Sequence, residues 1–263
     1  MFLSFGTSQA QDNNYLFYYG EPFAVFSKET GFSNFTLLYQ DPKTEKYKLD
    51  KALAKKIKFL WQYTESKPPM KFAVEKFEFD PENDDCTHEA KAVLKGIAPQ
   101  GVYTSLPLKK RAGASPHAAT EAENKLAAKL VMDYLKRDGY KASTIAAIIE
   151  HLQISAVNLK AGEKDSLIVK ADFEWHKKFI SMLVLVTPNA AKQLELSFAE
   201  TYASEMETES THISFSENID LGDGDGDRIL IERSHWENVD YSILARPNKK
   251  NEWKEQLSFN RGC

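Results

Sequence analysis

The second half of the chain alternates short apolar runs with turn signals, a pattern typical of β-strands. The predicted strands cover residues 157–159, 166–171, 179–186, 194–198, 212–215, 229–232, 241–245 and 253–259. Strand follows strand without a helix period between them. We therefore expect antiparallel pairing and not a doubly wound parallel sheet.

The first half is less regular. Aromatic runs at 15–19, 23–26 and 35–39 predict two or three more strands. Residues 49–63 change period, because Leu53, Ile57, Leu60 and Trp61 fall on one helical face, so we predict a helix with Asp50 as its N-cap. The strands expected next are residues 71–79, with a bulge where the phase slips at Glu75-Lys76, and 87–97.

Two stronger helices are predicted at residues 120–136 and 143–152, with Gly139 between them as a stop signal. The first carries an apolar stripe made of Leu126, Ala127, Leu130, Val131 and Tyr134. Together these elements predict an α+β fold, with antiparallel β-sheet(s) and a few helices.

A basic stretch with Gly and Ser, residues 109–116, is the best internal boundary. We therefore predict an N-terminal α+β region at 12–108, and a helical hairpin followed by a β-rich region at 117–263; one continuous domain is the alternative. Residues 1–11 are interpreted as a signal-peptide remnant, since Ser8-Gln9-Ala10 fits a small-x-small cleavage site. This predicts a periplasmic or secreted protein, with a frayed cytoplasmic N-terminus as the alternative.

Composition narrows the classes of partner. The net charge of -4 argues against nucleic acid, which requires a basic face. No apolar run reaches the roughly 20 residues that a membrane-spanning helix needs. The two cysteines, Cys86 and Cys263, would form a disulfide in an exported protein and stay reduced in the cytosol.

The acidic loop at 220–227, Asp-Leu-Gly-Asp-Gly-Asp-Gly-Asp, is the feature richest in chemistry. Calcium takes six to eight oxygen ligands, and carboxylates at every second residue of a glycine-rich turn can converge on one ion. Asp223 and Asp225 are therefore predicted ligands, Asp220 and Asp227 further ones, and Glu232 a more distant candidate.

Two registers of a helix-loop-helix calcium loop compete, and neither is complete. One uses Asp223, Asp225 and Asp227 but places Arg228 where glycine is needed. The other places Gly226 and Glu232 correctly but leaves Leu221 at the first ligand position. The flanking segments are predicted strands, which disfavours a helix-loop-helix hand.

The segment from about 213 to 263 resembles the Asp-x-Asp-Gly-Asp-Gly loops of integrin-type β-propeller repeats. It also resembles a C-terminal segment of uncharacterised exported bacterial proteins, in which such a loop leads into a strand, an aromatic strand and a tryptophan strand; Tyr241 and Trp253 are the counterparts here. It differs in having Gly222 where those loops usually carry Asp. The resemblance implies a calcium loop and export, and it implies no activity.

Other interpretations stay open. The loop could be a solvent-exposed acidic turn without an ion. His212 and His235 flank it and, with Asp223, could form a zinc or iron site, although ordinary polar histidines are the simpler interpretation. The acidic residues at 80–85 are a weaker second candidate for a cation site.

Motifs for a nucleophile or a phosphate-binding loop are absent from the sequence. We therefore expect an exported, non-enzymatic binding or structural module with a calcium-stabilised C-terminal β region and a protein or glycan ligand. The alternative is a metal-dependent hydrolase that uses the acidic loop. A third hypothesis is an interaction partner in an envelope assembly, with the aromatic N-terminal strands as its surface.

Overall fold

The structure, a computed structural model, describes residues 13–27, 29–65, 68–79, 90–206, 209–223, 226–246 and 252–262, except the side chains of 261 and 262. These residues fall into two compact units, one ending at Leu108 and the other starting at Lys109. Residues 1–11, Cys86 and Cys263 lie outside the described residues, so the predicted signal-peptide remnant and disulfide are not placed.

The first unit is built on one antiparallel sheet. Among its described residues the strand order is β3-β2-β1-β9-β6-β7-β8. β4 and β5 form a separate two-stranded sheet. The strands are β1 (Asn14–Tyr18), β2 (Glu21–Ser27), β3 (Gly31–Asn34), β4 (Leu38–Gln40), β5 (Tyr47–Leu49), β6 (Phe59–Gln62), β7 (Lys71–Glu78), β8 (Lys91–Leu94) and β9 (Val102–Thr104).

Strand β8, at the edge of this sheet, approaches the turn after β1. The Ala92 amide donates a hydrogen bond to the Gly20 carbonyl at 2.7 Å. Gly20 has a φ of 86°, and a Cβ at this position would lie 3.0 Å from the Ala92 carbonyl oxygen. Glycine is therefore required here by both the backbone conformation and the close approach. The core beneath is aromatic and aliphatic, with Phe17, Leu37, Leu60 and Tyr103 buried.

The predicted helix at 49–63 is wrong for most of its length. Asp50 does cap a helix, but α1 (Lys51–Ala54) has four residues, and residues 59–62 form strand β6. β6 pairs with both β7 and β9, so its backbone groups find sheet partners and Leu60 becomes fully buried. The predicted bulge in 71–79 is confirmed by the register shift between Val74 and Lys76.

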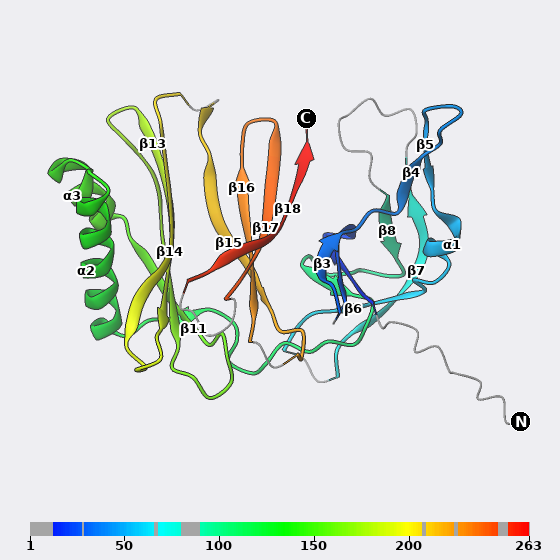
Figure 1. The fold of residues 1–263 in the computed structure, drawn as a ribbon, viewed down its shortest axis with the longest axis horizontal. Helices are drawn as coiled ribbons and strands as arrows, with labels where there is room; N and C mark the ends of the chain where they lie inside the picture. The colour runs from blue at the N-terminus through cyan, green and yellow to red at the C-terminus, as the bar shows by residue number, and fades with distance from the viewer. Residues whose placement is uncertain are drawn as a thin grey trace, which may run out of the picture. The chain divides into compact units, whose positions relative to one another are not determined.

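The second unit contains two described sheets and a helical hairpin (Figure 1). The first sheet has the order β10-β11-β12-β13-β14 and the second the order β15-β16-β17-β18. The helices are α2 (Glu121–Arg137) and α3 (Ala142–Glu150); the strands are β10 (His117–Ala118), β11 (Gln153–Val157), β12 (Ser166–Trp175), β13 (Lys178–Pro188), β14 (Leu194–Ser204), β15 (His212–Ile219), β16 (Arg228–Ser234), β17 (Asn238–Ala245) and β18 (Lys254–Gly262).

These elements form three layers, with the β10–β14 sheet between the helices and the β15–β18 sheet (Figure 1). β13 shows why the middle layer is apolar on both faces. Met182, Val184 and Val186 pack in the core beneath α2 and α3, whereas Leu183 and Leu185 pack against Ile229, Ile231 and Leu244 of the second sheet. Successive side chains of a strand point to opposite faces, so a central strand must be hydrophobic throughout.

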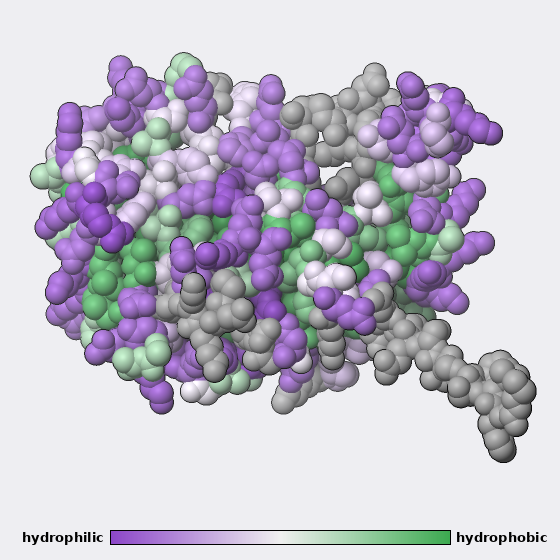
Figure 2. All heavy atoms as spheres, in the orientation of Figure 1, coloured by the Kyte–Doolittle hydropathy of each residue, from purple (hydrophilic) through white to green (hydrophobic). Residues whose placement is uncertain are grey.

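The described chain is thus mostly antiparallel sheet with a few short helices. The predicted helices at 120–136 and 143–152 are confirmed as α2 and α3, and Thr120 and Glu123 form a capping box at the start of α2. Hydrophobic residues also reach the surface in the region of α2 and β14 (Figure 2). No described helix is long and apolar enough to cross a membrane.

Candidate functional site

The acidic loop joins β15 to β16, and the pairing of Ile219 with Arg228 closes the hairpin below it. The Asp220 Oδ1 atom accepts a hydrogen bond from the Gly222 amide at 2.8 Å. Gly222 and Gly226 have φ angles of 70° and 92°, which glycine adopts without steric cost. Asp225, a predicted ligand, lies outside the described residues.

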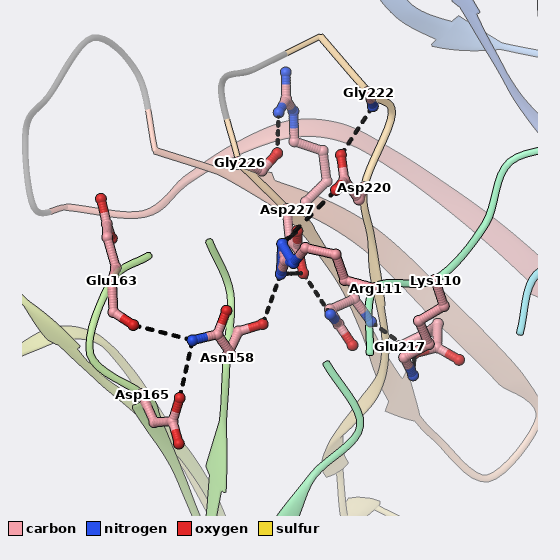
Figure 3. A network of polar contacts seen from close by, with 12 residues as sticks. Lys110, Arg111, Asn158, Glu163, Asp165, Glu217, Asp220, Gly222, Gly226 and Asp227 are labelled. Atoms are coloured by element: carbon pink, nitrogen blue, oxygen red, sulfur yellow. Dashed lines mark hydrogen bonds and ion pairs between the residues drawn. The ribbon is translucent and has the colours of Figure 1, made fainter. Parts of the chain in front are cut away.

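The Asp227 carboxylate is fully enclosed and faces Arg111 (Figure 3). Arg111 Nη1 and Nη2 donate to its two oxygens at 3.2 and 2.9 Å, and the Asn218 side-chain amide donates to Oδ2. Burial raises the pKa of Asp227 to about 6, against the opposing effects of Asn218 and Arg111. The two-pronged guanidinium contact offsets only part of the cost of removing this carboxylate from water, since the pKa stays raised.

Arg111 connects three segments that are distant in the sequence (Figure 3). Its Nη2 also donates to the Asn158 carbonyl at 2.7 Å, at the end of β11, and its Nη1 lies 3.7 Å from Asp220 Oδ2. The Asp227 amide donates to the Leu159 carbonyl at 3.0 Å. The segment predicted as the internal boundary, 109–116, is therefore tied to the second unit at this point.

Two further buried cations lie around the loop and pair with its carboxylates or with Glu217. Lys110 is 6% exposed, and its Nζ lies 2.5 Å from Glu217 Oε1. Arg228 is also 6% exposed; its Nη2 lies 2.6 Å from Asp223 Oδ2, and its Nη1 donates to the Gly226 carbonyl at 2.6 Å. Each described aspartate of the loop thus faces a guanidinium.

The arginine contacts of the loop use carboxylate oxygens that the calcium prediction assigns to an ion. Calcium needs six to eight oxygen ligands, and oxygens of Asp223 and Asp227 already accept hydrogen bonds from arginine. Within the described ranges, no group of three or more His, Cys, Asp or Glu side chains is placed to hold a metal ion. Calcium binding stays a prediction, because Asp225 belongs to the loop and is not described.

Glu232 lies apart from the loop. It stands in β16, four residues beyond Arg228, which is about 13 Å along a strand. Its carboxylate accepts a hydrogen bond from the Ser234 hydroxyl at 2.9 Å, and it pairs across the sheet with Ser214. The strand geometry therefore separates this predicted ligand from the described end of the loop at Asp227 and Arg228.

The predicted histidine candidates lie at the other end of the hairpin, where His212 pairs with Ser234. Each histidine contacts one hydroxyl and one carboxylate that sequence reasoning missed. His212 Nδ1 lies 2.9 Å from Asp172 and its Nε2 lies 3.2 Å from Ser210 Oγ. His235 lies 3.0 Å from Thr211 and 3.1 Å from Asp240. Neither histidine joins Asp223.

Ser210, His212 and Asp172 have the atom connections of a hydrolytic triad. Their surroundings differ from those of a catalytic site, because the nucleophile must be accessible and the carboxylate shielded from water. Ser210 is only 6% exposed, whereas the Asp172 side chain is 49% exposed. The three residues therefore link the start of β15 to β12.

A second candidate site is a groove between the two helices, which the sequence reasoning also missed. Its volume is about 610 Å³, within the usual range for ligand pockets. Its lining is predominantly apolar and consists of Met132, Lys136, Tyr140, Ala142, Ile145, Ala146, Ile149 and Glu150. We call this the α2–α3 groove.

A signal for the groove was present in α3. Residues 145–149 are Ile-Ala-Ala-Ile-Ile, so apolar side chains surround this short helix on all sides. A helix that lies on one sheet needs only one apolar face. Ile145 and Ile148 belong to the core, and Ile145 also lines the groove together with Ala146 and Ile149.

Comparisons with protein-family models, with curated proteins and with solved structures found no match for this chain.

Proposed function

We propose that this protein is a non-enzymatic binding module that takes up an apolar ligand in the α2–α3 groove. The observation that carries the proposal is the lining of the groove, in which six of eight residues are Met, Tyr, Ala or Ile. Apolar surface that is removed from water on binding stabilises a complex by roughly 25 cal/mol per Å². An apolar concavity of this size is typical of a small-molecule site.

The scaffold beneath the groove supports the proposal. α2 begins with a capping box, and its residues Ala127, Val131 and Leu135 are fully buried against the middle sheet. Ile145 and Ile148 fix α3 to the same core. A pre-formed site needs little ordering when the ligand arrives, which favours affinity. As part of the same proposal we infer an α+β class, in which the helical layer carries the binding surface.

The other predictions from the sequence are not part of this proposal. Export, a calcium-stabilised C-terminal region and a protein or glycan ligand stay predictions from the sequence. The hydrolase alternative needs an open coordination position beside the loop. The Arg111 and Arg228 contacts favour a structural role for the loop, since they occupy the oxygens that such a metal would use.

A neutral solvatochromic dye such as Nile red tests the proposal, because its emission changes when it enters an apolar site. Ala146 is exposed and lines the groove, so Ala146→Trp fills the groove without disturbing the core. We expect the wild-type protein to bind the dye and the variant to bind it at least about tenfold more weakly, a loss of about 1.4 kcal/mol.

Ala122→Trp is the matched control. Ala122 is an exposed residue of α2 that lies ten positions before Met132, about 15 Å along the helix axis. The control should bind the dye like the wild-type protein, and both variants should retain the wild-type melting temperature. Equal binding by wild type and Ala146→Trp, or no binding by wild type, would refute the proposal.

A further inference from the structure

The α2–α3 groove differs in charge between its two ends. Lys136, in the last turn of α2, and Tyr140 and Ala142, around the start of α3, line the end near the hairpin connection. Glu150, the last residue of α3, lines the other end. Met132, Ile145 and Ile149 provide the apolar surface in the lining. A cationic group thus marks one end and an anionic group the opposite end.

The start of α3 adds to the positive end. Its N-cap residue is Lys141, which makes no side-chain capping hydrogen bond, and its first turn holds no acidic residue. The first amide groups of a helix point outward and carry a partial positive charge, which acidic caps usually balance. Here the neighbouring side chains Lys136 and Lys141 are themselves basic.

Tyr140 supplies a neutral hydrogen-bond donor at the same end. Burial, together with Tyr134 and Asp138, raises the pKa of its hydroxyl, so the group stays protonated at physiological pH; the neighbouring Thr201 side chain acts in the opposite direction. A carboxylate can accept hydrogen bonds from a tyrosine hydroxyl and a lysine ammonium at the same time. The polar groups at this end therefore match an anionic head group, while the rest of the lining matches a hydrocarbon chain.

We propose that the ligand of the α2–α3 groove is a free long-chain monocarboxylate, with its carboxylate at Lys136 and its chain running toward Glu150. This inference rests on the proposed function. Glu150 fixes the direction, because an anionic head at that end would meet a like charge.

A single molecule fits better than a membrane surface. The apolar side chains line a concavity, whereas a membrane-binding helix presents its apolar face outward. Attraction to anionic lipid headgroups also takes a cluster of basic side chains, and the groove lining contains one lysine and one glutamate.

Displacement of bound Nile red by three twelve-carbon probes, dodecanoate, dodecan-1-ol and dodecyltrimethylammonium, tests the inference on the full chain. We expect dodecanoate to compete at least about tenfold more strongly than the alcohol, and the cation to compete least. Lys136→Met keeps the length of the side chain and removes its charge. It should erase the advantage of dodecanoate and leave dodecan-1-ol unchanged.

Lys125→Met is the matched control, because Lys125 is an exposed lysine of α2 that does not line the groove. It should retain the preference for dodecanoate. Tyr140→Phe should weaken dodecanoate binding more than alcohol binding, because a hydrogen bond to a charged acceptor is the stronger one. Added salt should weaken dodecanoate binding more than alcohol binding.

The outcomes separate the inference from the proposed function. Equal competition by dodecanoate and dodecan-1-ol, or an unchanged preference in Lys136→Met, overturns the inference and leaves an apolar groove that binds neutral ligands. No dye binding in the wild-type protein overturns the proposed function as well. Tighter association with phosphatidylglycerol vesicles than with monomeric dodecanoate would overturn the inference in favour of a membrane surface.

Discussion

At the scale of single residues, the acidic loop shows what a local pattern can and cannot predict. The spacing of its aspartates and glycines indicated a tight turn with convergent carboxylates. It did not indicate their partners, because Arg111 lies 116 residues before Asp227 in the sequence. Arg228 is local, but in the sequence it stands only as a residue that does not fit the glycine position of a calcium loop. Clustered carboxylates bind a metal ion or an arginine guanidinium, so the residue types of the loop alone do not tell which of the two partners is present.

Asp227 predicts a pH dependence of stability. Burial raises its pKa from 3.8 to about 6 in the folded state, so the folded protein binds this proton more tightly than the unfolded chain. The contribution of Asp227 to stability is therefore greatest below about pH 4 and is lost as the pH rises through about 6. A ¹³C titration of the side-chain carboxyl groups should show one aspartate with a midpoint near 6.

Urea unfolding gives the second measurement. The difference in unfolding free energy between wild type and Asp227→Asn should favour the wild type more at about pH 4.5 than at about pH 7. Asp133→Asn, at an exposed position of α2, serves as the control and should show no such change. An aspartate midpoint below 4 for Asp227 would contradict the prediction.

At the scale of elements, hydrophobic period predicted both helices of the second unit and its strands from β12 to β18. It missed β10, and it placed at 157–159 the strand that the structure has as β11 at Gln153–Val157. It failed at 49–63, where the helical spacing of Leu53, Ile57 and Leu60 gave way to strand β6. β6 pairs with two strands that come later in the chain, and tertiary pairing of this kind overrides a local pattern. The segment at 109–116 was predicted only as a boundary, and the chain does divide between Leu108 and Lys109. The ion pairs of Lys110 with Glu217 and of Arg111 with Asp227 were not predicted, because their partners lie more than 100 residues away in the sequence.

Removal of Arg111 tests the role of that segment. Arg111→Met leaves the Asp227 carboxylate buried without its guanidinium and breaks the contact with Asn158. Loss of one partner of a buried ion pair costs about 3–5 kcal/mol. We expect chemical unfolding to show a loss of this order, and Arg137→Met, at an exposed position, to show none.

The double variant Arg111→Met/Asp227→Asn should recover part of that loss, because it removes the uncompensated charge. A stability of Arg111→Met within about 0.5 kcal/mol of the wild-type value would mean that the pair is only a surface contact.

At the scale of the whole molecule, the sequence predicted antiparallel sheet with a few helices but not its division into layers. Alternation identifies which side chains of a strand share a face, and it does not say which sheet or helix covers that face. β13 is apolar on both faces because α2 and α3 cover one of them and the β15–β18 sheet covers the other. The α2–α3 groove arises from this same layering, since it forms where two helices meet above a shared core.

The response of the full chain to calcium decides between two accounts of how the β15–β18 sheet is held at its acidic end. If the ion predicted from the spacing is structural, a chelator lowers the melting temperature of the wild-type protein and calcium restores it, because a ligand that binds only the folded state stabilises it by mass action. The described contacts give a different expectation. Arg111 and Arg228 already contact the carboxylates of Asp220, Asp223 and Asp227, so we expect wild-type melting to be the same with chelator and with calcium.

In Arg111→Met the two carboxylates of Asp220 and Asp227 lose their shared guanidinium, and a divalent cation can then replace the missing positive charge. Calcium should therefore raise the melting temperature of this variant while leaving the wild-type protein and Arg137→Met unchanged. Differential scanning fluorimetry of the three proteins, each with chelator and with calcium, is sufficient. A wild-type protein that melts lower in chelator would show that an ion, and not arginine alone, holds this loop.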